Sequence, residues 1–151
     1  MKPFPWKCGT CRQYGLVPAV LDYQTEIAHD GRVHQLSLPA LKVFRCEQCG
    51  AIVLDDEACK KITAALRAAA GLLSAEEIRR GREALGLSQE QFARYLQVDQ
   101  ETLARWETGG QLPSRAMDRL LRIYFQVPEA RHFIETTANA PAELNLPSPS
   151  A

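Results

Sequence analysis

The sequence contains no long hydrophobic run. No stretch of its 151 residues approaches the roughly 18 consecutive apolar residues that mark a membrane-spanning helix. The N-terminus also lacks an apolar segment followed by a small-residue cleavage site, which is the pattern of a secretory signal. We therefore expect a cytoplasmic protein that does not enter a membrane.

The sequence also lacks an excess of charge of either sign. The formal net charge is zero, and residues 74–127 hold as many arginines as acidic residues. The overall charge therefore does not indicate a nucleic-acid-binding surface, and any phosphate binding must come from a few locally positioned basic or polar groups. The fractions of hydrophobic and charged residues, 46% and 24%, are normal for a globular chain of one ordinary or two small domains.

Arrangements typical of catalysis are missing as well. There is no Ser/His/Asp pattern and no glycine-rich phosphate loop. We expect no enzymatic activity.

Cysteine is scarce, but its placement is informative. Four of the five cysteines form two C-x-x-C pairs, Cys8 with Cys11 and Cys46 with Cys49. In an intracellular protein such pairs indicate metal ligation rather than disulfides. Four thiolates can surround Zn²⁺ tetrahedrally and leave no position for water, so we predict one structural zinc per chain. A redox C-x-x-C site and an iron–sulfur cluster are the alternatives. A redox site needs only one C-x-x-C pair, and an iron–sulfur cluster does not need its cysteines in two C-x-x-C pairs, so both explain this pattern less well than zinc.

The spacer between the two pairs has the pattern of β-structure. Residues 15–27, 33–38 and 41–45 are expected to form three antiparallel strands, and Asp30-Gly31 signals a hairpin. This sheet has too few apolar residues for a core of its own, so zinc binding should supply much of its folding free energy. His29 and His34, in or beside the hairpin, are expected to be surface residues rather than ligands.

A helix over residues 56–70 should follow, with Asp55 as its N-cap. Its apolar stripe is expected to bury Cys59. Four further helices besides the recognition helix described next complete the helical part. They are expected at residues 75–85, 89–96, 115–124 and 129–137.

Residues 87–109 carry the signature of a helix-turn-helix. Ser88 and Gln91 form a capping box, so a helix begins at Gln89. After a tight connection, Asp99 is the N-cap candidate of a second helix over residues 100–108, which stops at Gly109. Two short helices joined this closely favour DNA binding over an ordinary helical pair.

The second helix would place side chains in the major groove of DNA. Gln100, Glu101 and Thr102 lie in its first turn, which enters the groove first, and Arg105 follows on the same outward face. Arg can bind both guanine O6 and N7, while Gln suits adenine and Glu suits cytosine. Gln89, at the start of the preceding helix, is expected to bind a backbone phosphate. An i, i+4 salt bridge between Glu101 and Arg105 is the alternative role for Arg105.

The run LSQEQFARYLQVDQETLARWETG resembles the helix-turn-helix of the Xre/Cro repressor family, which shares the opening L-[ST]-Q-x-x-[FL]-A and the close [RW]-x-E-x-G. The resemblance continues through Leu112-Pro113 to Tyr124. The family usually has Gly where this chain has Gln97. Either Gln97 takes a mildly strained positive φ, or the turn has a different shape from the family's.

The whole arrangement resembles the MqsA-type antitoxins, which have a YgiT-type zinc finger followed by an Xre helix-turn-helix. It consists of C-x-x-C, a strand-rich spacer, C-x-x-C-G, a long helix and the helix-turn-helix. The resemblance implies a homodimer that binds a palindromic operator and represses its own operon, and a zinc module that neutralises a toxin, typically an RNase. By position, the family's DNA contacts fall on Glu101 and Arg105; family members tend to have Asn in place of Glu101.

The predicted fold class is α+β. A small zinc-bound antiparallel β module with a linking helix occupies residues 1–72, and an all-α five-helix Xre-type domain occupies residues 73–137. Residues 138–151, rich in Pro and Ser, are expected to be disordered. The helices at 115–124 and from Glu129 are the expected dimer contact, through Ile123, Phe125 and Phe133.

Two other functions fit the same residues. The chain would be a stand-alone transcription factor if the zinc module were only structural or ligand-sensing. It would be an adaptor if that module bound RNA or protein and the helix-turn-helix served only for dimerisation.

Overall fold

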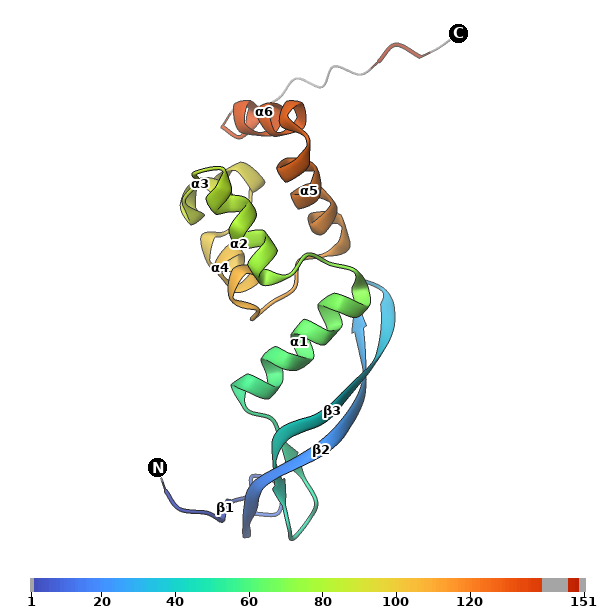
Figure 1. Ribbon diagram of the computed structural model, residues 1–151, viewed down its shortest axis with the longest axis vertical. Coiled ribbons are helices and arrows are strands. Elements are labelled where there is room, and N and C mark those ends of the chain that lie inside the picture. Colours follow the sequence, from blue (N-terminus) through green and yellow to red (C-terminus); the bar gives the residue numbers. More distant parts are fainter. Residues whose placement is uncertain (1, 140–146, 150–151) are drawn as a thin grey trace.

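The chain forms two modules stacked along one long axis (Figure 1). In the computed structural model, residues 2–139 and 147–149 are described. The N-terminal module consists of β1–β4 and α1, and the C-terminal module of α2–α6. Most of the segment expected to be disordered, residues 140–146 and 150–151, lies outside the described residues. Within the described part, no helix is long and apolar enough to cross a membrane.

A four-stranded antiparallel sheet forms most of the N-terminal module. Its strands follow one another in chain order: β1 (Trp6–Lys7), β2 (Tyr14–His29), β3 (Arg32–Cys46) and β4 (Ile52–Val53). The predicted hairpin turn is confirmed, since Asp30 and Gly31 both have positive φ, 51° and 77°. Strands β1 and β4 were not predicted, because two residues are too few to show a periodic pattern.

The prediction of separate strands at residues 33–38 and 41–45 is wrong, because both belong to β3. Pairing with β2 continues across Pro39 and Ala40, with a register shift between Leu21 and Tyr23. Ala40 has a φ of 53°, and its N–H donates to Asp22 Oδ1 at 3.0 Å. The Asp22 carboxylate thus satisfies the backbone group that the bulge leaves unpaired, and the strand bends without ending.

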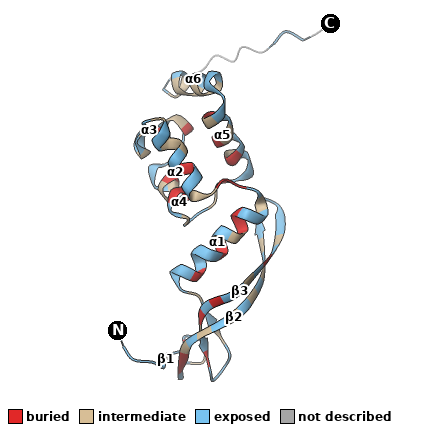
Figure 2. Ribbon diagram, viewed as in Figure 1, coloured by how far each residue is buried: buried red, intermediate tan, exposed pale blue. Residues whose placement is uncertain are grey.

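Helix α1 (Asp56–Ala70) covers one face of the hairpin and completes its core. Asp55 caps it by accepting from Ala58 N at 2.8 Å, as predicted, and Gly71 ends it in the left-handed conformation. Buried residues line the contact between helix and strand (Figure 2). They are Leu36, Leu41 and Val43 of β3 and Ala58, Ile62 and Leu66 of α1.

Cys59 is exposed, so the prediction of a buried thiol is wrong. The buried stripe of α1 runs through Ala58, Ile62 and Leu66, four residues apart. Cys59 is one residue beyond Ala58 and therefore lies about 100° around the helix from that stripe.

Five helices form the C-terminal module, as predicted. They are α2 (Ala75–Ala84), α3 (Gln89–Leu96), α4 (Gln100–Thr108), α5 (Arg115–Gln126) and α6 (Pro128–Thr137). The predicted capping box of Ser88 with Gln91 is present, and Ser74 forms a second one with Glu77. The largest fully buried side chains of the module come from α2 to α5: Ile78, Phe92, Leu103, Leu121 and Tyr124.

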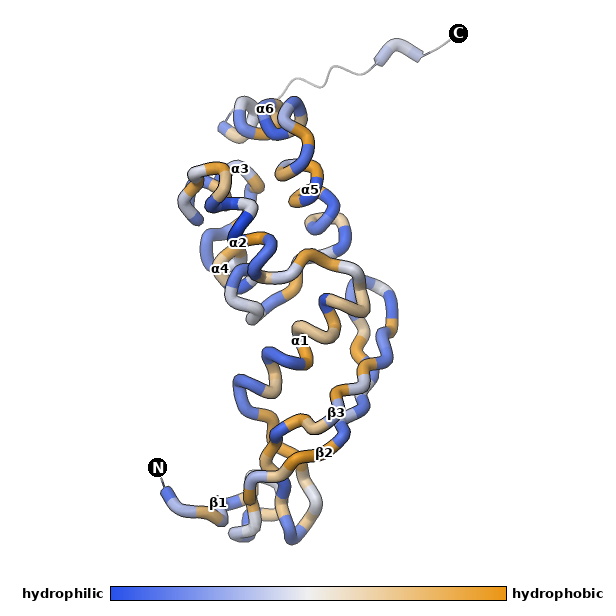
Figure 3. Tube along the Cα trace, viewed as in Figure 1, coloured by the Kyte–Doolittle hydropathy of each residue, from blue (hydrophilic) through white to orange (hydrophobic). Residues whose placement is uncertain are grey.

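The connection between the modules is hydrophobic and buried. Leu72 and Leu73, which join α1 to α2, are 9% and 8% exposed. The corresponding stretch of the trace is apolar (Figure 3). The link between the modules is therefore packed against its surroundings and is not a flexible tether.

Candidate metal centre and DNA-binding face

The four paired cysteines lie together at the end of the sheet farthest from the C-terminal module. Cys8 follows β1, Cys46 ends β3, and pairing of Leu16 with Cys46 brings the two C-x-x-C segments together. The four Sγ atoms all lie within 4.8 Å of one another.

The spacing of these sulfurs fits a tetrahedral metal. The Sγ atoms of Cys8 and Cys49 are 3.8 Å apart, and those of Cys11 and Cys46 are 3.7 Å apart. A ZnS₄ tetrahedron with Zn–S bonds of about 2.3 Å has S···S edges of about 3.8 Å. The cysteine cluster can therefore hold a metal ion with little rearrangement.

Backbone hydrogen bonds shape the two cysteine turns. Arg12 N donates to Cys8 O at 3.0 Å, and Gly50 N donates to Cys46 O at 2.8 Å. Gly50 has a φ of 74°, as expected of a glycine in a tight turn, but in the first turn the left-handed residue is Arg12, at 62°. The first turn therefore places Arg12, and not Gly9, in the left-handed conformation.

Gly15 is a residue of this site that the sequence reasoning missed. A Cβ atom there would lie 2.9 Å from Gln48 Cγ and 3.2 Å from Cys46 Sγ. Because a larger residue would push against a cysteine sulfur, the absence of a side chain at Gly15 keeps the cluster compact. An isolated glycine inside a strand pattern was the available signal.

Peptide N–H groups favour the thiolate form of one cysteine. Those of Cys11 and Thr10 lower the pKa of Cys8 to about 6. For Cys11, the N–H of Gln13 acts in the same direction, but desolvation and the neighbouring thiols outweigh it and raise the pKa to about 11. Thiolate is the form of cysteine that binds metals.

The helix-turn-helix of α3 and α4 presents the predicted side chains at its surface. Gln100, Glu101 and Arg105 are exposed and Thr102 is half-buried, while Leu103 and Trp106 fill the core. Asp99 is the N-cap residue, but its side chain makes no capping hydrogen bond. The outward face of α4 is therefore polar along its whole length.

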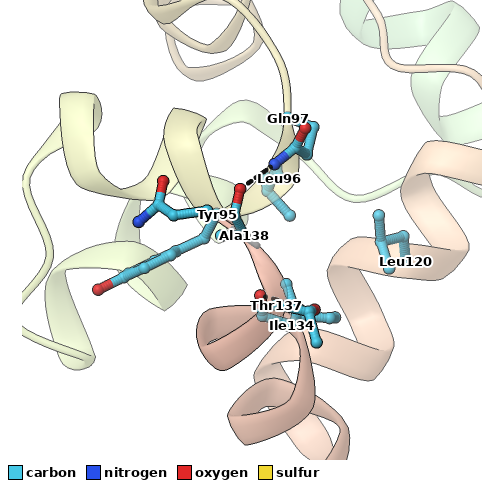
Figure 4. A pocket seen from close by; sticks show the side chains of 8 residues that line it. Tyr95, Leu96, Gln97, Leu120, Ile134, Thr137 and Ala138 are labelled. Atoms are coloured by element: carbon cyan, nitrogen blue, oxygen red, sulfur yellow. Dashed lines mark hydrogen bonds between the residues drawn. The ribbon is translucent and has the colours of Figure 1, made fainter. Parts of the chain in front are cut away.

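The turn between α3 and α4 is built on a non-glycine residue. Gln97 has a φ of 59° and a ψ of 39°, so of the two alternatives the structure has the left-handed residue. Its Nε2 donates to the carbonyl oxygen of Ala138 at 2.7 Å, beside a pocket lined by Tyr95, Leu120 and Ile134 (Figure 4). This bond links the turn to the end of α6.

Glu101 and Arg105 form an ion pair. Arg105 Nη2 lies 2.6 Å from Glu101 Oε1 across one turn of α4. The salt bridge considered for Arg105 is therefore present in the protein without DNA. Such an exposed pair is weak enough to exchange for contacts with DNA.

A buried carboxylate joins Gln89 to α2. The side chain of Glu107 is 2% exposed and accepts from Arg82 Nε at 2.6 Å and from Gln89 Nε2 at 2.7 Å. Gln89, predicted to bind phosphate, is thus held by Glu107. Glu107 was missed as a site residue, although it is the glutamate of the [RW]-x-E-x-G pattern.

Comparison with known families identifies the C-terminal module. Residues 78–129, about a third of the chain, match the HTH_3 family, described as helix-turn-helix. No curated protein matches the sequence. With the exposed polar face of α4, the match defines a DNA-binding domain. This domain is a helix-turn-helix of the Xre type, which indicates a DNA-binding regulator.

Proposed function

We propose that this protein is the antitoxin of a type II toxin–antitoxin system, which neutralises a partner toxin and represses its own operon. One observation supports the proposal above all: a four-cysteine module and an Xre-type domain are joined in one chain through α1. This order of parts resembles the MqsA-type antitoxins. The proposal assigns no catalytic step to the chain.

The metal of the cysteine cluster is zinc, bound for structure. Four thiolates complete a tetrahedral shell, which leaves no position for substrate or water. A metal there links β1, β3 and the turn before β4, which share a small core around Cys8, Leu16 and Cys46. Zinc therefore stabilises the surface that the module presents to a partner.

The side chains on the outward face of α4 recognise the DNA bases. Gln100, Glu101 and Thr102 contact base edges at the first turn, and Arg105 leaves Glu101 to bind a guanine. Gln89 contacts a phosphate. Its Nε2 carries two hydrogens, and Glu107 takes one, so the second can bind a phosphate oxygen.

The protein binds a palindromic operator as a homodimer. Ile123 and Val127 at the end of α5 and Phe133 on α6 are exposed apolar residues suited to a contact with a second copy. Phe125, which was expected to join them, instead packs against the core, 5.6 Å from the ring of Phe92. Two copies would place their α4 helices about 34 Å apart in successive major grooves.

The partner toxin, an RNase in the proposal, binds the N-terminal module. Pull-down from the native host with the tagged full-length chain tests this directly, with Cys46→Ser as the metal-deficient control. Recovery of a small RNase with the wild type but not with Cys46→Ser supports the proposal. Sequence-specific DNA binding without any bound toxin would instead indicate a stand-alone regulator with a structural metal site.

A further inference from the structure

A buried arginine of α1 reaches out of the N-terminal module into the DNA-binding domain. Arg67 is 4% exposed, and burial lowers the pKa of its guanidinium, an effect that Asp118 partly offsets. Its Nη2 donates to the carbonyl oxygens of Trp106 and Gln111, each at 2.8 Å, and its Nη1 donates to Leu73 O at 3.2 Å. Arg67 thus binds the last turn of α4 and the segment that follows it.

The tip of the β2–β3 hairpin binds the same segment from another side. His29 Nε2 lies 3.2 Å from the carbonyl oxygen of Pro113, and Arg115 N donates to Asp30 Oδ2 at 2.8 Å. Asp30 therefore accepts from a free N–H at the start of α5. The hairpin reaches from the cysteine cluster to α5 (Figure 1).

Packing joins the same two parts. Leu112, from the α4–α5 connection, packs against the core between α1 and the sheet. Two residues of α5 bind the link between the modules, residues 71–74: Asp118 accepts from Leu73 N at 2.7 Å, and Arg122 Nη2 donates to Gly71 O at 3.0 Å. We call these contacts, with those of Arg67 and the hairpin tip, the joint between the modules. The α4–α5 connection, residues 109–114, is therefore held by both modules.

We propose that the N-terminal module positions the recognition helix: Arg67 and the hairpin tip fix the end of α4 and the α4–α5 connection in the geometry that binds DNA. Arg67 and Asp30 are positioning residues that need not touch DNA. A helix that reads bases must be held to within about 0.5 Å. Helix α4 has only nine residues, so the contacts at its C-terminal end add to the anchoring by Leu103 and Trp106 in the core. Whatever binds the N-terminal module then acts on DNA binding through these contacts.

The first test removes the arginine contacts while keeping the side-chain bulk. Arg67→Met should weaken binding of the full chain by about 3- to 30-fold to a duplex selected by the wild type from a random library. Arg67→Lys should recover part of that loss. Lys61→Met is the matched control, because Lys61 lies on the same helix and pairs only with Glu57, at 3.7 Å. It should bind as the wild type does.

The second test reaches the same joint from the hairpin, where the substitution is exposed and spares both cores. Asp30→Ala should also weaken DNA binding. Glu26→Ala is its control, because Glu26 bonds only to Gln35 within the hairpin. By NMR relaxation, the two modules should share one tumbling time in the wild type and have separate times in Asp30→Ala.

Unchanged affinity and common tumbling in Asp30→Ala would overturn the inference, whether or not Arg67→Met folds. The inference rests on the DNA binding of the Xre-type domain and not on the antitoxin role. If the wild type selects a duplex but binds no toxin, the antitoxin proposal fails, and the two tests above still decide the positioning role.

Discussion

Arg105 and Glu101 bond to each other across the outward face of α4, with Nη2 and Oε1 only 2.6 Å apart. Both side chains are more than half exposed, so the pair contributes only about 0.2–0.5 kcal/mol to folding. The position of the pair on the recognition helix gives it more importance for binding than for stability.

Arg105→Ala should therefore reduce DNA binding while leaving the stability of the fold nearly unchanged. We expect a loss of about 1–3 kcal/mol and relaxed preference at one base pair per half-site. Binding to single-base variants of the operator measures this. Arg80→Ala breaks a comparable exposed pair on α2, with Glu76 at 2.8 Å, and serves as the control. If Arg105→Ala leaves preference unchanged at every position, Arg105 reads no base.

The cysteine cluster should contain one zinc per chain. Cys11→Ser or Cys46→Ser should abolish metal binding and unfold the metal end of the sheet, while the C-terminal module keeps its cooperative melting. Metal analysis and amide hydrogen exchange measure these effects. Cys59→Ser, outside the cluster and exposed, should retain the metal. Absence of zinc from freshly purified, tag-free protein would rule out the assignment.

Glu107 should be essential to the stability of the helix-turn-helix. Glu107→Gln removes the buried carboxylate that pairs with the largely buried guanidinium of Arg82, at a cost of about 3 kcal/mol in the free energy of unfolding. Glu83→Gln is the control, because Glu83 also lies near Arg82, at 3.8 Å, but is 57% exposed. Its effect should stay within about 0.5 kcal/mol. Denaturant unfolding gives the free energy of unfolding of each variant. Equal losses in Glu107→Gln and Glu83→Gln would contradict the stabilising role of Glu107.

Phe133 should support the dimer. Phe133→Ser should shift the protein toward monomer at micromolar concentration and weaken binding to a full palindrome, with little change for an isolated half-site. Light scattering and DNA titration measure the two effects. Val20→Ser removes a side chain from β2 that is equally exposed, 63%, and should leave the dimer intact. Monomeric wild-type protein would argue against dimerisation altogether.

Local signals in the sequence determined most of the secondary structure and marked the cysteines of the candidate metal site. The capping box at Ser88 starts its helix as predicted, since a cap depends on residues only three positions apart. The Asp30-Gly31 turn and the C-x-x-C pairs are equally short patterns. Each of these signals lies within one turn of chain, although the pairing of β2 with β3 is what brings the two C-x-x-C pairs together.

The tertiary structure decided every feature that depends on distant residues. Asp22 keeps β3 continuous through a hydrogen bond to Ala40, and Glu107 binds Gln89 and Arg82 from another helix. The joint made by Arg67 spans 39 residues to Trp106 and 44 to Gln111. Backbone carbonyls are its acceptors, and because every residue carries one, no sequence pattern marks which of them a buried arginine will bind.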